Sequence, residues 1–420
     1  MTHRERVRAA LDHKQPDRVP VDFSSTMVTG ISVSVVSRVR KALGLDSPDD
    51  RVRVIEPYQM LGEISDDLRD RLLIDCVGLF GTKNMFGFEN RDWKEWTTFD
   101  GTGVLVPRLF NTEPDNHGNI PMYAGGDRAY PPAAVMPKGG FYFDSTERQK
   151  PIDDSRLDVE ENLEEFGLYS EEELTWLERE SKRLYNDTDR TIVYSMGGTS
   201  FGDIAFVPGP MLKDPKGIRG VEEWYVSTVL RKNYIREVFD RQCEIGMKNL
   251  ELVKEAVGDH IDVIFITGTD FGTQRGPFIS PDAYRDLFQP VHKQVCSWIH
   301  ANTHWKILIH SCGGIRPLIP DMIESGFDIL NPVQCSAEGM EPQGLKDDFG
   351  NRLTFWGGGI DTQKTLPFGT PEEVYNQVSE RIRIFNREGG FVFNAIHNVQ
   401  AGTPVENFMA MMDAIRDSFR

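Results

Sequence analysis

A histidine and a cysteine separated by one residue form the segment of this sequence best suited to chemistry. His310 and Cys312 flank Ser311, precede two glycines, and follow the apolar run 305–309. Residues two apart in an extended chain point to the same side, so both side chains can reach one point beyond a strand end. An imidazole and a thiolate are favoured zinc ligands. The alternative is an inert buried cysteine, because a lone His-x-Cys motif has little specificity.

A third ligand is available at the end of the last apolar run. His397 follows the run 390–394, and closure of a barrel would bring it near His310 and Cys312. Three protein ligands with one open position are typical of a catalytic zinc site, whereas structural sites have four. Cys335, which follows another apolar run, is the alternative candidate for an additional ligand.

A second group of histidines competes with this prediction. His292, Cys296, His300 and His304 recur every four residues, which places them on one face of a helix. That helix precedes a strand and lies far from the strand's C-terminal end. We therefore expect the stripe to pack on the fold or to face solvent, not to bind metal.

Carboxylates and polar side chains also stand where strands are expected to end. Asp270 and Asp361 are candidate catalytic acids or bases. The alternatives are an ion pair between Asp270 and Arg275 and a helix-capping role for Asp361. Contacts to substrate are expected from four further residues, which are Asp22, Gln274, Arg275 and Gln363.

The elements that must position these residues alternate along the chain. Short apolar runs of β type are followed by loops and then by helical patterns, which predicts a parallel sheet. Eight such runs favour a closed (β/α)8 TIM barrel, whose reactive residues lie at the C-terminal strand ends. An open doubly wound sheet is the alternative, but no Gly-rich nucleotide loop follows any run. The runs are 19–23, 74–80, 191–195, 262–266, 305–309, 327–330, 353–356 and 390–394.

One long segment does not follow this alternation. Residues 81–190 are rich in Gly, Pro, Asp and aromatic residues, and they end in an acidic helical stretch at 170–184. We interpret the segment as an insertion between the second and third strands of a single domain, 1–420. Such long loops usually shape a substrate pocket, although a role in oligomer formation is the alternative.

The composition restricts the class of function. The 420 residues include 47 Lys and Arg and 65 Asp and Glu, which gives a formal net charge of −18. This charge argues against nucleic acid or an anionic membrane as partner. We find no apolar run long enough to span a membrane and no apolar secretory signal. With five cysteines in no framework spacing, we expect a cytoplasmic enzyme that acts on a small molecule.

The chain resembles the uroporphyrinogen decarboxylase superfamily over almost its whole length. Several segments match in the order in which the superfamily has them, which is more specific than any single match. The resemblance implies a TIM barrel, in agreement with the independent count of strands. The matching segments are 4–7, 16–22, 279–284, 310–313, 356–363, 397–400 and 402–407.

True decarboxylases of this superfamily bind a tetrapyrrole with many carboxylates, and their first strand is followed by an arginine-containing motif. Here the corresponding stretch, 24–30, contains no arginine, and 79–82 lacks the catalytic Phe-Ser-Asp type motif. Because cations pair with carboxylates, their loss weakens the case for that substrate. A carboxy-lyase of porphyrin metabolism is the first alternative, and a non-catalytic small-molecule-binding barrel is the second.

The chain is more similar to the zinc-dependent, corrinoid-linked methyltransferases of the superfamily. These use a His-x-Cys pair, matched by His310 and Cys312, and a distant cysteine, whose position His397 occupies. The resemblance implies Zn²⁺ on these residues and a methylated corrinoid supplied by a partner protein, since no Asp-x-His-x-x-Gly corrinoid pattern occurs here. It implies methyl transfer from or to a methoxylated compound (O-demethylation), an alcohol or a thiol, and it favours a homodimer.

Overall fold

The parallel sheet is the centre of the structure, a computed structural model that describes residues 1–47, 50–196 and 198–419. Within these residues seven strands form one parallel sheet in the order β14-β13-β12-β11-β10-β9-β3. Each strand pairs with its neighbour in chain order, as successive β-α-β crossovers require. The strands are β3 (Cys76–Leu79), β9 (Thr191–Ser195), β10 (Val263–Thr267), β11 (Lys306–His310), β12 (Ile329–Asn331), β13 (Thr354–Trp356) and β14 (Phe391–Val392).

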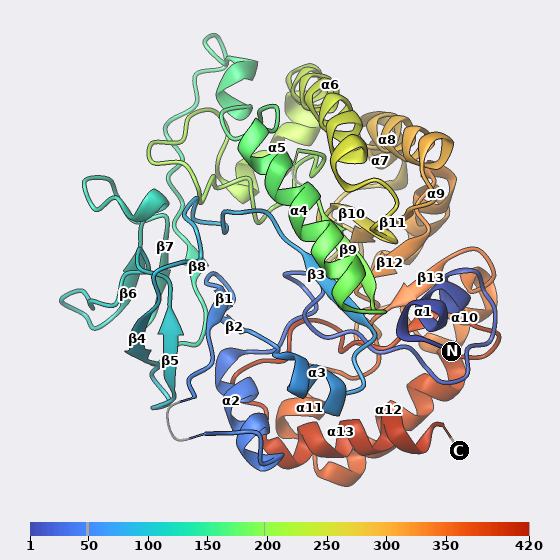
Figure 1. Cartoon of the computed structure of the whole chain (residues 1–420). Coiled ribbons are helices and arrows are strands. Elements are labelled where there is room, and N and C mark those ends of the chain that lie inside the picture. Colours follow the sequence, from blue (N-terminus) through green and yellow to red (C-terminus); the bar gives the residue numbers. More distant parts are fainter. Residues whose placement is uncertain (48–49, 197, 420) are drawn as a thin grey trace.

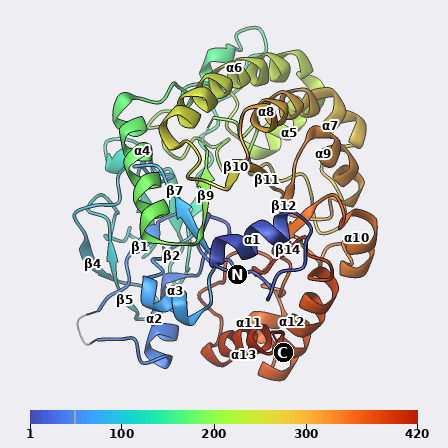
Figure 2. The ribbon, with the colours of Figure 1, turned by 45° about the vertical axis from the view of Figure 1, so that its right-hand side comes forward.

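The sheet is curled, because its two edge strands contribute to one cluster of buried side chains. Cys76 of β3 and Val392 of β14 belong to the same apolar cluster as residues of every strand between them. A flat sheet would hold these edges far apart. A curled parallel sheet surrounded by helices (Figures 1 and 2) is consistent with a TIM-like barrel. The intervening residues of the cluster are Val193, Val263, Phe265, Leu308, Ile329 and Trp356.

The expected first strand at 19–23 is reduced to a single β-bridge. The N–H of Asp22 donates to the carbonyl of Phe393 (2.9 Å), and the N–H of Asp75 donates to the carbonyl of Val21 (2.7 Å). The segment therefore lies between β14 and the residue that precedes β3. Pro20 has no N–H to donate, which shortens the ladder here.

Helices cover the outside of the strands and begin at the signals that the sequence carries. Thr370 caps α12 in a reciprocal capping box with Glu373, and Pro371 occupies the first turn. Within the described residues no helix is long and apolar enough to cross a membrane. The helices are α1 (His3–Leu11), α2 (Val33–Ala42), α3 (Asp66–Arg71), α4 (Glu171–Asp187), α5 (Val221–Leu230), α6 (Lys232–Val257), α7 (Pro281–Leu287), α8 (Gln289–Asn302), α9 (Ile319–Ser325), α10 (Pro342–Phe349), α11 (Thr365–Phe368), α12 (Pro371–Phe385) and α13 (Val405–Asp417).

Between β3 and β9 the chain leaves the parallel sheet and forms small antiparallel sheets and α4. Figure 1 shows the small sheets to one side of the parallel strands. One pairs β4 (Lys94–Thr97) with β5 (Gly103–Val106), and the other contains β6 (Ile120–Met122), β7 (Ala134–Met136) and β8 (Asp144–Ser145). A further pair, β1 (Val54–Glu56) and β2 (Leu61–Gly62), precedes β3.

Helix α1 closes the N-terminal end of the sheet. Its Val7 and Leu11 belong to the apolar cluster inside the curl. Its Arg6 binds the buried Asp75 at 2.7 Å, directly before β3. Arg18 binds the other oxygen of Asp75 at 2.7 Å. Figure 2 shows α1 beside β14. The opposite, C-terminal end of the strands is therefore the end available for a site.

We expect Asp75→Ala to lower the free energy of unfolding by about 3–5 kcal/mol, because it leaves the buried Arg6 and the partly buried Arg18 without their shared carboxylate. Asp17→Ala is the matched control. Asp17 also binds Arg6, but its side chain is 41% exposed, so we expect a loss of about 1 kcal/mol or less. Chemical denaturation measures both, and equal losses would contradict this account of α1.

Candidate metal centre

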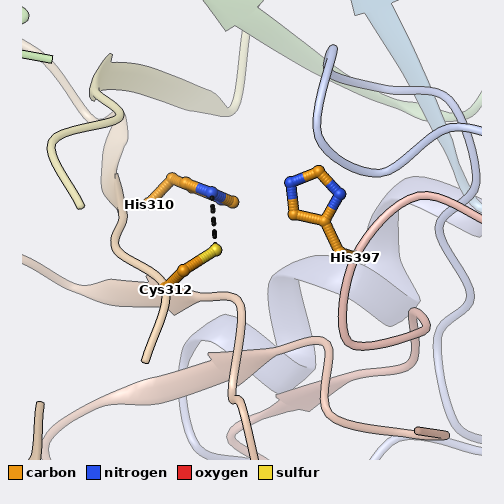
Figure 3. Close-up of side chains that lie close together, drawn as sticks. All are labelled: His310, Cys312 and His397. Carbon is orange, nitrogen blue, oxygen red and sulfur yellow. Dashed lines mark hydrogen bonds between the residues drawn. The ribbon is translucent and has the colours of Figure 1, made fainter. Parts of the chain in front are cut away.

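Three side chains from two strand ends converge at the C-terminal end of the sheet. The metal-binding atoms of His310, Cys312 and His397 all lie within 4.8 Å of one another. Figure 3 shows His310 and Cys312 side by side with the His397 ring facing them. The His310 Nε2 and Cys312 Sγ atoms are 3.4 Å apart. Ligands of a tetrahedral zinc ion lie about 3.3–3.8 Å from one another, so the types of donor atom and the His310–Cys312 spacing fit zinc.

The imidazole of His310 is held in the orientation that a metal ligand needs. Its Nδ1 lies 2.6 Å from Oδ1 of Asn331, and Nδ2 of Asn331 donates to the carbonyl of Trp356 at 2.8 Å. The amide orientation assigned from this second bond makes Oδ1 an acceptor, so Nδ1 of His310 carries the proton. The lone pair of Nε2 is then directed at the thiol of Cys312. Such partners orient the ligands of metal sites.

Two loops pack backbone to backbone beneath Cys312. The N–H of Cys312 donates to Oδ1 of Asp270 at 2.6 Å. Gly313 has a φ of +92°, and a Cβ there would lie 2.3 Å from the backbone of Gly272. Only glycine accommodates both the left-handed backbone and this close approach. The glycine after Cys312 therefore brings Asp270 to the metal-binding group, where its Oδ1 lies 3.8 Å from Nε2 of His310.

His397 reaches the same point from the loop that follows β14. Its neighbour Asn398 is buried and ties that loop to the segment after the first β-bridge. Oδ1 of Asn398 accepts from the N–H of Gly30 at 2.6 Å, and its Nδ2 donates to the carbonyl of Met27 at 3.0 Å. The position of His397 therefore depends on contacts between the two ends of the chain.

Burial sets the protonation of the group. It lowers the pKa of both His310 and His397 to about 4, and for His397 the neighbouring His310 lowers it further. Both imidazoles are neutral near pH 7, which is the form that binds metal. Burial and then the charge of Asp270 hold the pKa of the Cys312 thiol well above its usual range. A bound cation is what would favour the thiolate here.

His310 and His397 line a cavity of about 480 Å³. Asp270 lines it as well, together with three other carboxylates, Glu56, Glu165 and Asp203. Much of the remaining wall is aromatic or thioether, from Tyr58, Phe166, Phe206, Phe265, Met27, Met85, Met196 and Met211. The cavity is of the size and composition typical of small-molecule sites.

The other residues predicted for the site lie elsewhere. Asp22 is fully buried and accepts from Trp356 Nε1 (2.9 Å) and Ser25 Oγ (2.7 Å). Asp361 accepts the N–H groups of Gln363 and Lys364, which is a capping arrangement. Neither Asp22 nor Asp361 lines the cavity, in contrast to Asp270.

Three polar residues of the loops beyond the cavity complete the predicted set. Gln274 donates to Gln363 at 3.3 Å, so these two amides connect their loops. Arg275 is exposed. The structure does not bring Gln274, Arg275 or Gln363 to the cavity wall.

Sequence reasoning missed Asn331, Glu56 and Asp203. Asn331 could have been found, because it ends a predicted strand as His310 does and pairs with it in register. Glu56 belongs to β1 and Asp203 to the loop after β9, where no periodic pattern marks a site.

The helical stripe does not form a metal site. His292 and Cys296 are buried in α8, and His300 binds Asp328 at 2.8 Å. Helix α8 ends at Asn302, so His304 lies outside it. The predicted helix face therefore carries three of the four residues. Within the described residues His310, Cys312 and His397 are the one group of three with metal-binding geometry.

We expect His292 to make the protein sensitive to acid. Burial lowers its pKa to about 3, so below the unfolded value of about 6.5 the unfolded chain binds a proton that the native state does not. The free energy of unfolding should then fall by about 2 kcal/mol between pH 7 and pH 5 from this residue alone. Urea denaturation at both pH values should show a smaller loss of stability for His292→Phe than for the wild-type protein. Identical pH profiles of the two proteins would contradict this role of His292.

Comparison with known families supports the resemblance found in the sequence. Residues 241–418 match the family described as uroporphyrinogen decarboxylase (URO-D). The methylated-thiol–coenzyme M methyltransferase of Methanosarcina mazei is 28% identical over 140 residues, which are 33% of this chain and 34% of that protein. The chain thus matches about a third of the length of this curated relative. The predicted resemblance to the superfamily, with similarity to one of its methyltransferases, is confirmed.

A solved structure supports the fold. A methyltransferase from Methanosarcina mazei superposes with a TM-score of 0.55, and the match covers 100% of both chains. Its sequence identity is 16%, so this similarity concerns the fold alone. The α/β architecture inferred from the alternating runs is confirmed at this level.

Proposed function

We propose that this chain, which carries a URO-D family domain over residues 241–418, is a zinc-dependent methyltransferase. In this proposal it transfers a methyl group from or to a small molecule, such as a methoxylated compound, an alcohol or a thiol. A separate corrinoid protein supplies or receives the methyl group at the open end of the cavity. The observation that carries the proposal is the convergence of His310, Cys312 and His397 on one point, where His310 and His397 line the cavity.

Zn²⁺ held by these three residues would supply Lewis acidity, which lowers the pKa of a coordinated thiol or hydroxyl and so favours its reaction with a methyl group. The chain's own residues have separate roles. Asn331 fixes the tautomer of His310, and Asp270 orients the Cys312 loop through its N–H. Because Asp270 also lines the cavity, we assign it the exchange of a proton with the substrate. Asp361, which caps its own loop, has no role in this proposal.

The ligand set differs from the superfamily pattern in one position. One thiolate and two imidazoles leave the site less anionic than a set with two thiolates. A less anionic set makes the metal a stronger Lewis acid toward a weakly acidic ligand. This favours an alcohol or an ether as substrate at least as much as a thiol.

We further propose that residues 1–420 form one (β/α)8 barrel, with 20–22 as its first strand and 81–190 as an insertion between the second and third strands. The hydrogen bonds of Val21 and Asp22 to Asp75 and Phe393, on either side, support this. Homodimer formation and a cytoplasmic location remain parts of the proposal that come from the sequence.

The decarboxylase alternative has less support. Among the described residues that line the cavity, Lys83 is the single lysine or arginine, whereas four are acidic, namely Glu56, Glu165, Asp203 and Asp270. A substrate with many carboxylates requires the opposite charge.

Methyl transfer tests the proposal directly. Zinc-loaded protein is incubated with methylcobalamin and, in turn, a thiol or an alcohol, and loss of the methyl–cobalt bond is followed by absorbance. We expect transfer that disappears on chelation and returns with zinc. Decarboxylation of uroporphyrinogen, or methyl transfer that does not depend on zinc, would overturn the proposal.

A further inference from the structure

Among the described residues, Glu56 and Asp203 are two buried carboxylates of the cavity wall that have no cationic partner. Glu56 and Asp203 are each only 6% exposed. The oxygens of Glu56 accept the N–H groups of Tyr58 (3.1 Å) and Gln59 (2.5 Å). Oδ1 of Asp203 accepts the N–H of Ala205 at 2.9 Å. These carboxylates are therefore oriented by backbone groups that leave their charge uncompensated.

Of the other two acidic groups in this wall, one is paired with a cation and the other lies at the metal-binding group. Glu165 binds Arg219 at 2.7 Å. Asp270 contacts the N–H of Cys312 and lies beside the metal-binding group. Lys83 lines the cavity but is exposed to solvent. Within the described residues no ion pair reaches Glu56 or Asp203, so no cation of the protein offsets a negative charge on either carboxyl group.

The rest of the wall suits a cation with an apolar surface. Tyr58, Phe166, Phe206 and Phe265 present aromatic rings, and four methionines present polarizable thioethers. Aromatic faces attract quaternary ammonium groups by cation–π interaction, and thioethers adapt to irregular shapes. Burial raises the pKa of Glu56 to about 7 and that of Asp203 above its usual range. A cationic ligand would offset this cost of desolvation.

We propose that the small molecule held in this cavity carries a positive charge, as a quaternary ammonium compound does, and that Glu56 and Asp203 select it. The proposal names the substrate class of the proposed methyltransferase and rests on that function only in using the same cavity. An anionic substrate is disfavoured, because it could not offset the cost of ionising these two buried carboxyl groups and would be repelled by either of them when ionised.

A matched pair of probes isolates the charge. Choline and 3,3-dimethylbutan-1-ol have the same shape, but the second has carbon in place of the charged nitrogen. We expect isothermal titration calorimetry on the wild-type protein to show choline binding at least about tenfold tighter than its neutral analogue, and ethanesulfonate to show no binding. Equal affinity for choline and the neutral analogue, or stronger binding of ethanesulfonate, would overturn the proposal without any variant.

Variants then assign the residues. Glu56→Gln and Asp203→Asn should each lower the affinity for choline about tenfold and leave the neutral analogue unchanged. Glu172→Gln, which removes an equal charge from the exposed start of α4, should change neither. Unchanged choline binding in folded Glu56→Gln and Asp203→Asn would overturn the assignment.

The outcome is separable from that of the proposed function. Binding of choline is measured with zinc present and after chelation, and it requires no methyl transfer. If the protein binds choline but holds no zinc, the proposed methyltransferase function is wrong and the proposed cation site stands. If methyl transfer depends on zinc but choline binds no more tightly than its neutral analogue, the proposed cation site is wrong and the proposed methyltransferase function stands.

Discussion

Cys312→Ala is expected to lower the affinity for zinc by more than about 100-fold and to reduce zinc-dependent methyl transfer to background. Loss of a group that only orients a metal ligand costs about 10–100-fold in affinity, and loss of the ligand itself should cost more. The change removes the thiol that lies 3.4 Å from Nε2 of His310. Zinc per protein after dialysis against a competing chelator measures the effect, with circular dichroism to establish that the variant is folded.

Cys335→Ser is the matched control for Cys312. The thiol of Cys335 lies 3.9 Å from the carbonyl of Gly358 and does not belong to the metal-binding group. The control should therefore retain its zinc. Retention of zinc by Cys312→Ala together with its loss from Cys335→Ser would show that the wrong cysteine has been assigned.

Substitution at His397 should have the second large effect, and its direction depends on the new side chain. His397→Ala removes one of three protein ligands and should weaken zinc binding by more than about 100-fold. His397→Cys replaces an imidazole by a thiolate, which zinc also accepts, and should recover at least about tenfold of that loss. Competition with a chromogenic chelator measures both affinities.

The two His397 variants test the ligand rather than the loop. Both remove the imidazole, and both leave Asn398 to tie the loop to Gly30. A purely structural role for His397 would make Ala and Cys equivalent in zinc affinity. Equal affinities, or wild-type affinity in His397→Ala, would exclude His397 from the metal site.

The strands could be predicted because both faces of a parallel sheet are buried, which leaves continuous apolar runs. The run 191–195 coincides with β9, and the runs at 262–266 and 305–309 are each shifted by one residue from β10 and β11. The His-x-Cys pair was visible for the same reason. Because alternate residues of a strand point to the same side, a strand that ends near His310 directs the side chains of His310 and Cys312 the same way.

A strand-end position does not reveal where a side chain points. Asp22 and Asp270 both stand near the ends of apolar runs, yet the carboxylate of Asp22 turns to Trp356 while Asp270 reaches the cavity. That difference depends on partners more than 300 residues away, as the separation of Asp22 and Trp356 shows. Glu56 and Asp203 were invisible because their elements carry no repeating pattern, and only tertiary packing brings them to the cavity wall.

X-ray absorption at the zinc edge of the wild-type protein tests the central claim most directly. The account predicts one zinc per chain with one sulfur ligand at about 2.3 Å and two imidazole nitrogens at about 2.0–2.1 Å, with a light atom completing the shell. Protein that takes up no zinc after incubation with it, or a zinc shell with two or more sulfurs or with no imidazole, would contradict the assignment of His310, Cys312 and His397.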